Sequence, residues 1–377
     1  AASASGQEAC SSQMAELTLE ERVMRDVYGD WTAEGWKPKP LPVSEAGGSP
    51  SGQRRYLWTD AFGVLNFVAL AERQAGTQQA GSTLAAASRL IDAVHECLGA
   101  PRGDDFPMRP ASDGGFEGLR IGKERARLIS DSGMEFDGMY WHYLDKWIFA
   151  LARYARATGD GAALQRGLRL VRQVHPRFLA RLPSGEPLGL YWKMNVDLTT
   201  IPGRERTGPT GDAVGGLIAY TAMERARVAL GVEDSGTLAA EIADLKAVVQ
   251  RYVSGGGFEN ATDDPLGFGL QCWEAQFFDP ELADGLLGQL AVLADSALHR
   301  RHLALPFRLY GGIIGARLSG RAELVAKAEA LLASGEPLEM ATACGEAPHS
   351  GINKVMFATA LNPSALGRRE GEDPIGL

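Results

Sequence analysis

MEFDGMYWHYLDKWIFALARYARATGD, residues 134–160, is the stretch from which the fold of the whole chain can be worked out. Its first part carries acidic, aromatic and imidazole groups. Its second part is apolar at helical spacing and stops at a Thr-Gly-Asp turn, after which a second apolar stretch begins. The segment therefore predicts a helix over 136–157 whose polar end holds candidate chemistry and whose remainder belongs to a core.

The same order of helix, glycine turn and helix recurs along the chain, as expected when one structural unit is reused. The turn sequences ERQAGTQQAGSTLAAASRL, YARATGDGAALQRGLRLV and ARLSGRAELVAKAEALL all follow it. Helix pairs are predicted at 58–75 with 82–98, 136–157 with 162–181, 210–230 with 237–253, 266–278 with 281–298, and 307–317 with 321–333. A first helix over 14–28 and a last one over 351–361 make the sixth pair.

Six similar helical hairpins bury their apolar faces most simply by closing into a double-layered ring. No strand-like alternation of useful length interrupts them, so the predicted fold is an all-α (α/α)6 toroid. We expect one domain over residues 1–377, with flexible ends at 1–12 and 363–377. The longer connections precede the first helix of each pair and therefore emerge on one face of the ring, where a site is expected.

Composition excludes several classes of function. The net charge of -9 argues against a nucleic-acid-binding protein, which needs a basic surface to neutralise phosphates. No apolar window is long enough to span a bilayer, so no membrane partner is predicted. The four cysteines are far apart and lack CxxC spacing, which predicts free thiols and slightly favours a cytoplasmic compartment.

Three helix starts resemble a known group of proteins. They are Leu57 to Phe62 (LWTDAF), Phe136 to Leu144 (FDGMYWHYL) and Tyr191 to Leu198 (YWKMNVDL). Together they resemble the six-hairpin glycosidase superfamily, and more narrowly an uncharacterised branch of it, over about residues 56–361. The resemblance implies an (α/α)6 toroid and carbohydrate chemistry. It assigns no reaction, because one fold hosts many.

Acidic residues are the first catalytic candidates, because glycoside hydrolysis uses a general acid and a general base. Asp60, Asp137 and Asp212 each lie near the start of a predicted inner helix, and Glu274 is a fourth candidate. Asp137 is favoured because the aromatic residues around it would desolvate its carboxyl group and raise its pKa. The alternative for each acid is a structural role at the positive end of a helix dipole.

Histidines and one polar loop supply a different chemistry. His142 follows Trp141 on the predicted helix, and His349 lies in the last long loop. In the extended stretch 192–197, Lys193, Asn195 and Asp197 alternate with apolar residues and would share one face. Two arginines then follow that could bind a carboxylate or phosphate through paired hydrogen bonds: Arg204 and Arg206. Wall residues and salt-bridged loops are the alternatives.

Aromatic rings gather near the starts of the inner helices or in the loops before them. Flat rings stack on sugar faces, although aromatic residues at helical spacing also fill cores. The candidates for substrate binding are Trp58, Tyr140, Trp141 and Trp192.

The leading hypothesis is therefore a carbohydrate-active enzyme, a glycoside hydrolase with Asp137 and either Asp60 or Asp212 as acid and base. One alternative is a uronate lyase or sugar epimerase, which would use His142, Tyr140, Asn195 and Arg206. The other is a carbohydrate-binding toroid without catalysis. A small molecule or oligosaccharide is the expected partner. No cofactor is predicted, and no metal, because Cys272, Cys344 and His349 lack the spacing of a zinc site.

Overall fold

The structure is a computed structural model of the 377-residue chain. It describes residues 17–42, 53–103, 107–125, 136–202, 211–232, 236–257, 261–299, 305–343 and 349–376. Within those ranges the chain forms thirteen α-helices, one 3-10 helix and four short strands. The helices predicted from the sequence are all present, with ends that differ by a few residues.

Six helices form a closed inner ring, because each contacts the next and the last packs against the first. In order they are α2 (Leu57–Arg73), α4 (Trp141–Thr158), α6 (Asp212–Ala229), α8 (Pro265–Ala275), α10 (Phe307–Leu318) and α13 (Ser350–Leu361).

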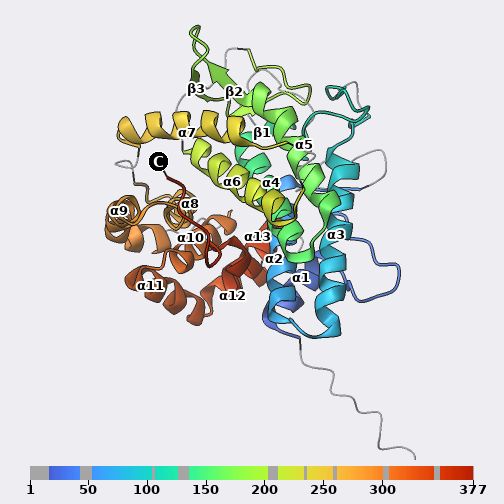
Figure 1. The fold of residues 1–377 in the computed structure, drawn as a ribbon. Coiled ribbons are helices and arrows are strands. Elements are labelled where there is room, and N and C mark those ends of the chain that lie inside the picture. Colours follow the sequence, from blue (N-terminus) through green and yellow to red (C-terminus); the bar gives the residue numbers. More distant parts are fainter. Residues whose placement is uncertain are drawn as a thin grey trace, which may run out of the picture.

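An outer layer of six helices surrounds this ring, each packed on one inner helix (Figure 1). They are α3 (Gln78–Leu98), α5 (Gly161–Phe178), α7 (Ala239–Ser254), α9 (Pro280–His299), α11 (Ala322–Ala333) and α1 (Leu19–Tyr28), which packs on α13. This arrangement confirms the predicted (α/α)6 toroid, including its closure by the first and last helices.

Burial explains why the two layers differ in sequence. Every residue of α2 from Leu57 to Ala71 is buried, as expected for a helix that touches neighbours on all sides. The outer helix α5 instead buries Leu164, Leu168 and Val171 at helical spacing and leaves its other face to solvent. Inner helices are therefore mostly apolar on every face, whereas outer helices are amphipathic.

The closest helix contact in the ring joins α8 and α10. A Cβ atom added at Gly315 would lie 1.9 Å from the carbonyl oxygen of Gly269, and one added at Gly269 would lie 2.0 Å from that of Gly311. The two backbones therefore touch, and only glycine fits at these positions. By contrast α6 and α8, the neighbours on the other side, touch only lightly.

Several elements were not predicted. Helix α12 (Glu336–Ala343) follows α11. Strand β1 (Met139–Tyr140) pairs antiparallel with β4 (Lys193–Met194), and β2 (Leu179–Arg181) pairs with β3 (Pro187–Leu190). The helix predicted from residue 136 begins instead at Trp141, because the residues before it are held in the β1–β4 ladder.

The C-terminal segment is packed, which does not fit the prediction of a flexible end over 363–377. It contains the 3-10 helix η2 (Ser364–Leu366), and the backbone N–H of Ile375 donates to the carbonyl of Phe277 at 2.7 Å. Its Glu372 pairs with Arg153 near the end of α4 at 3.0 Å. The segment therefore packs against the C-terminal parts of α4 and α8.

Candidate functional site

The β1–β4 ladder builds one edge of the site, because it sets Tyr140 opposite Lys193. The Lys193 ammonium donates to the Tyr140 hydroxyl at 3.0 Å and also to the carbonyl of Phe136. It lies 4.2 Å from the centre of the Tyr140 ring, a cation–π contact. A buried lysine thus fixes the position of the Tyr140 phenol.

Five rings then gather at the start of α4, and we call them the aromatic cluster: Trp58, Tyr140, His142, Tyr143 and Trp192. The imidazole of His142 lies parallel to Trp192 at 6.2 Å between centroids and edge-on to Tyr143 at 4.7 Å. It is 6.0 Å from Trp58 and 5.4 Å from Tyr140. His142, Tyr143 and Trp192 are half-buried, so the cluster presents part of its surface to solvent.

His142 is the polar centre of this cluster. Its Nδ1 is buried and has no hydrogen-bond partner among the described residues, and the same holds for Nε1 of Trp58. Burial, reinforced by the charges of Lys146 and Lys123, lowers the pKa of His142 to about 3. The imidazole is therefore neutral near pH 7, and Nδ1 is left unsatisfied in the absence of a ligand.

A second group of charges lies next to the aromatic cluster. We call Asp145, Lys146, Asp212 and Glu274, from α4, α6 and α8, the carboxylate–lysine cluster. The Lys146 ammonium lies 3.0 Å from both carboxylate oxygens of Asp145. It also borders, with Trp58, a small apolar cavity of about 20 Å³ inside the ring.

One lysine cannot neutralise three carboxyl groups, so burial dominates their ionisation. Desolvation, opposed by Lys146, raises the pKa of Asp145 to about 7 and that of Glu274 to about 8. Burial also raises the pKa of Asp212. Near neutral pH the cluster therefore holds protonated and ionised carboxyl groups side by side.

Asp137, the favoured catalytic acid, is held by four hydrogen bonds. Arg102 and Arg120 donate to Oδ2 at 3.0 and 2.9 Å, and the backbone N–H groups of Gly122 and Lys123 donate to Oδ1 at 2.9 and 3.3 Å. The carboxylate is buried and both oxygens are occupied. Through these contacts Asp137 fastens the loop before α4. This structural role differs from the predicted one at a helix dipole, because α4 begins only at Trp141.

Asp60 also lies away from the aromatic cluster. Two residues on a helix differ by about 200°, so Asp60 points to the side of α2 opposite Trp58 and Phe62. Its Oδ1 accepts from the Tyr28 hydroxyl at 3.1 Å and lies 3.4 Å from Arg55. Burial raises the pKa of this carboxyl group. It therefore faces the outer helix α1 rather than the centre of the ring.

Other predicted residues have local roles. Trp141 is buried and donates through Nε1 to the carbonyl of Asp212 at 2.9 Å. Asn195 and Asp197 bond to Thr199 within one turn, at 3.0 Å and 2.6 Å between side chains. His349 precedes α13 with a positive φ of 70°. Arg204 and Arg206 lie outside the described residues.

Sequence reasoning omitted two members of the site, Tyr143 and Asp145. Tyr143 completes the aromatic cluster and its hydroxyl lies 2.6 Å from that of Tyr56. Asp145 is three residues beyond His142 on α4, a spacing that puts both on neighbouring parts of one helix face. That periodicity was the available signal for Asp145.

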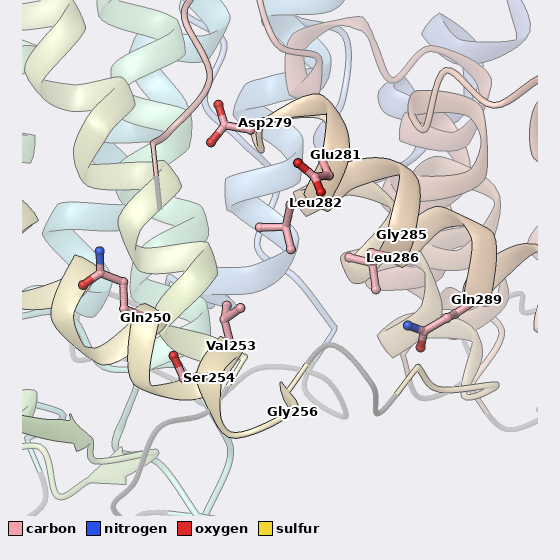
Figure 2. A pocket seen from close by; sticks show the side chains of 10 residues that line it. All are labelled: Gln250, Val253, Ser254, Gly256, Asp279, Glu281, Leu282, Gly285, Leu286 and Gln289. Carbon is pink, nitrogen blue, oxygen red and sulfur yellow. The ribbon is translucent and has the colours of Figure 1, made fainter.

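A groove of about 620 Å³ lies elsewhere, between α7 and α9 (Figure 2). Gln250 and Ser254 line one side, while Glu281, Leu282 and Gln289 line the other. None of the predicted site residues borders it. The groove is on the outer layer, and its mixed lining gives it no evident part in the chemistry of the aromatic cluster.

Comparison with known proteins assigns no family, since no family model and no curated protein matches the chain. Two solved structures are similar at low identity. A sugar epimerase from a ruminal bacterium aligns with a TM-score of 0.45 and 10% identity over 91% of this chain and 99% of that one. Cellobiose 2-epimerase from Spirochaeta thermophila DSM 6192 aligns with a TM-score of 0.46 and 13% identity over 85% and 87%.

At such TM-scores these likenesses decide neither family nor reaction, so the chemistry has to be argued from the side chains of this chain. In the described ranges no helix is long and apolar enough to cross a membrane. The same ranges contain no group of three or more His, Cys, Asp or Glu residues arranged to hold a metal ion.

Proposed function

We propose that the chain is a carbohydrate-active enzyme that moves a proton on its sugar substrate, as an epimerase or a lyase does. The observation that carries this proposal is the buried Nδ1 of His142 inside the aromatic cluster, which has no hydrogen-bond partner among the residues that the structure describes. A neutral imidazole can accept a proton from carbon next to a carbonyl or carboxylate group, provided that the substrate lies within hydrogen-bond reach.

The aromatic cluster supplies the binding surface in this proposal. Trp192 and Tyr143 are half-buried, so each leaves part of its ring for contact with the apolar face of a sugar. Nε1 of Trp58, which has no partner in the described part of the chain, can donate to a sugar hydroxyl. A ligand that bonded to both Nε1 of Trp58 and Nδ1 of His142 would satisfy two buried polar atoms, which favours binding.

Tyr140 is the second proton-transfer group. Its hydroxyl accepts a hydrogen bond from the Lys193 ammonium at 3.0 Å, which holds the phenol beside His142, and in this proposal the phenol gives its proton to a substrate oxygen or carbon. The positive charge of Lys193 stabilises negative charge that develops on a bound enolate. His142 would then remove the proton and Tyr140 would donate one, and the two rings are 5.4 Å apart.

Hydrolysis by the carboxylate–lysine cluster is a second candidate. Glu274, with a pKa of about 8, would be the protonated acid, and Asp212 or Asp145 would be the base. Asp145 and Glu274 are only 2% and 6% exposed, so the side chains around them would have to move to admit a substrate, as those around Nδ1 of His142 would. Asp137, which the sequence favours as one of the two catalytic acids, and Asp60, one of its two predicted partners, are less suited, because both are paired to arginine.

Deuterium exchange separates these reactions. The purified protein would be incubated in D2O with neutral aldoses, neutral oligosaccharides and uronate oligomers, and carbon-bound deuterium would be followed by NMR. An epimerase or lyase places deuterium at one sugar carbon or yields an unsaturated product, whereas a hydrolase yields reducing ends without exchange at carbon.

His142→Gln tests the assignment of the base. We expect exchange to fall by about 10²–10⁴-fold, the usual contribution of a general acid or base. His299→Gln is the matched control, because that histidine is exposed on the outer helix α9. Unchanged exchange in His142→Gln would reject this residue as the base. Binding without any turnover would instead favour the non-catalytic toroid.

A further inference from the structure

A separate pocket of about 350 Å³ lies on the outer layer, between α3, α5 and the loop over residues 107–119. It contains none of the residues of the aromatic cluster. Its volume falls in the range of about 300–1,000 Å³ that is typical of small-molecule sites. The side chains that line it combine one exposed aromatic ring with several hydrogen-bonding groups.

Phe116 provides the aromatic ring. It is 38% exposed, and in the described ranges only Val228 and Val292 are other large apolar side chains that are exposed. The loop holds it in place, since Phe116 forms a β-bridge with Pro110 and the neighbouring Glu117 N–H donates to the carbonyl of Arg109 at 2.8 Å. The backbone that carries the ring is therefore held without a ligand, which limits the entropy lost on binding.

Glu117 fastens the same loop from the other side. Its carboxylate pairs with Arg109 at 2.8 Å and with Arg177 of α5 at 3.3 Å. The loop that carries Phe116 is thus tied to the helix that forms the opposite wall of the pocket. This is the rigid support that a binding surface requires.

The polar walls carry balanced charge. Arg166 pairs with Asp92 at 2.6 Å, and Arg169 approaches Asp113 at 3.8 Å. Two arginines and the two acids that line the pocket, Asp113 and Glu96, leave it with no net charge. Such a lining offers both donors and acceptors, which suits hydroxyl groups better than it suits an anion.

His95 completes the lining with a defined tautomer. The indole N–H of Trp147 can only donate, and it points at Nε2 of His95 at 3.3 Å. Nε2 is therefore the acceptor and Nδ1 carries the proton. Burial, followed by the charges of Arg166 and Arg169, lowers the pKa of His95 to about 3, so the ring is a neutral donor near pH 7.

We propose that this pocket binds one uncharged sugar unit, stacked on Phe116 and hydrogen-bonded by Arg166, Arg169, Glu96 and His95. It is a saccharide site separate from the aromatic cluster. An aromatic platform beside paired carboxylate and guanidinium groups matches the two faces of a sugar, one apolar and one rich in hydroxyls. The proposal does not depend on which reaction the aromatic cluster performs.

The test measures binding with the aromatic cluster disabled by Trp192→Ala. Isothermal titration and saturation-transfer NMR would use neutral glucose, mannose and xylose hexasaccharides, with an oligogalacturonate as the charged probe. We expect at least one neutral probe to bind Trp192→Ala, and the addition of Phe116→Ala to weaken it roughly tenfold. Val292→Ala is the control, an exposed apolar truncation on α9 that should leave Kd unchanged.

Three results would overturn the proposal: no neutral probe binds Trp192→Ala, Phe116→Ala leaves its Kd unchanged, or the oligogalacturonate binds more tightly than every neutral probe. If the Phe116 variant does not fold, Arg169→Gln replaces it with the same expectation. Loss of deuterium exchange in His142→Gln or Trp192→Ala would not affect these binding measurements. The two proposals can therefore fail separately.

Discussion

Asp137 and Asp145 lie on the same stretch of chain, and both are buried, yet their surroundings are opposite. Asp137 accepts hydrogen bonds from two arginines and two backbone N–H groups. Asp145 shares one lysine with Asp212 and Glu274, and its pKa rises to about 7. The carboxylate of Asp137 has every oxygen hydrogen-bonded by groups from other parts of the chain, whereas the carboxyl group of Asp145 can change its charge near neutral pH.

The difference shows what makes a buried acid available for chemistry. Position near the start of an inner helix is common to Asp137, Asp60 and Asp212, so position alone does not separate structural from reactive groups. The number of hydrogen-bond donors that other parts of the chain supply to each acid separates the structural groups from the reactive ones. A buried acid with more donors than oxygens is structural, and one that competes for a single cation can exchange protons.

The largest expected effect follows from breaking the Asp137 contacts. Asp137→Asn leaves Arg102 and the fully buried Arg120 without a counter-charge, which costs about 3–5 kcal/mol when a buried pair is broken. Urea denaturation followed by circular dichroism would measure it. Asp197→Asn, in a half-buried turn, is the control and should change stability by less than about 1 kcal/mol. A near-normal midpoint for Asp137→Asn would contradict the structural role.

A second effect, which depends on pH, comes from Glu274. Its pKa is raised from 4.5 to about 8, so the folded state binds a proton more tightly than the unfolded state. Stability contributed by that proton is complete below about pH 4.5 and is lost as the pH rises towards 8. The slope from this group is up to about 1.4 kcal/mol per pH unit.

Comparison of the wild-type protein with Glu274→Gln isolates that slope. The unfolding free energy would be measured at pH 5, 6, 7 and 8, and the variant should gain stability relative to the wild type as the pH rises. Glu323→Gln, on the exposed side of α11, should show no such trend. A difference between wild type and Glu274→Gln that stays constant with pH would mean that Glu274 does not titrate in this range.

The fold could be read from the sequence because its signals are local. Helix periodicity and glycine turns lie within each hairpin, and the all-apolar α2 already marks an inner helix. Elements that depend on distant partners escaped prediction. Met139 and Tyr140 become a strand only because Lys193 and Met194 pair with them. Ile375 is buried only because Phe277 accepts its N–H.

The site was partly predictable for the same reason. Trp58, Tyr140, His142 and Trp192 share loop-side positions, and the structure brings them together in the aromatic cluster. The partners of Asp137 could not be foreseen, since Arg102 and Arg120 come from a connection whose path no local pattern fixes. Helical spacing from His142 could have indicated Asp145, but this residue lies within an apolar segment and was not predicted.

The smallest expected effect concerns Asp60, whose surroundings are intermediate between those of Asp137 and Asp145. Its Oδ1 meets Arg55 and Tyr28, while its Oδ2 is buried with no partner in the described residues. Asp60→Asn keeps the shape and removes a desolvated charge, so the loss of the Arg55 contact is partly offset. We expect a change of about 1 kcal/mol in unfolding free energy and unchanged deuterium exchange. If deuterium exchange in Asp60→Asn fell as far as in His142→Gln, Asp60 would be a catalytic residue after all, although it lies on the side of α2 that faces Tyr28.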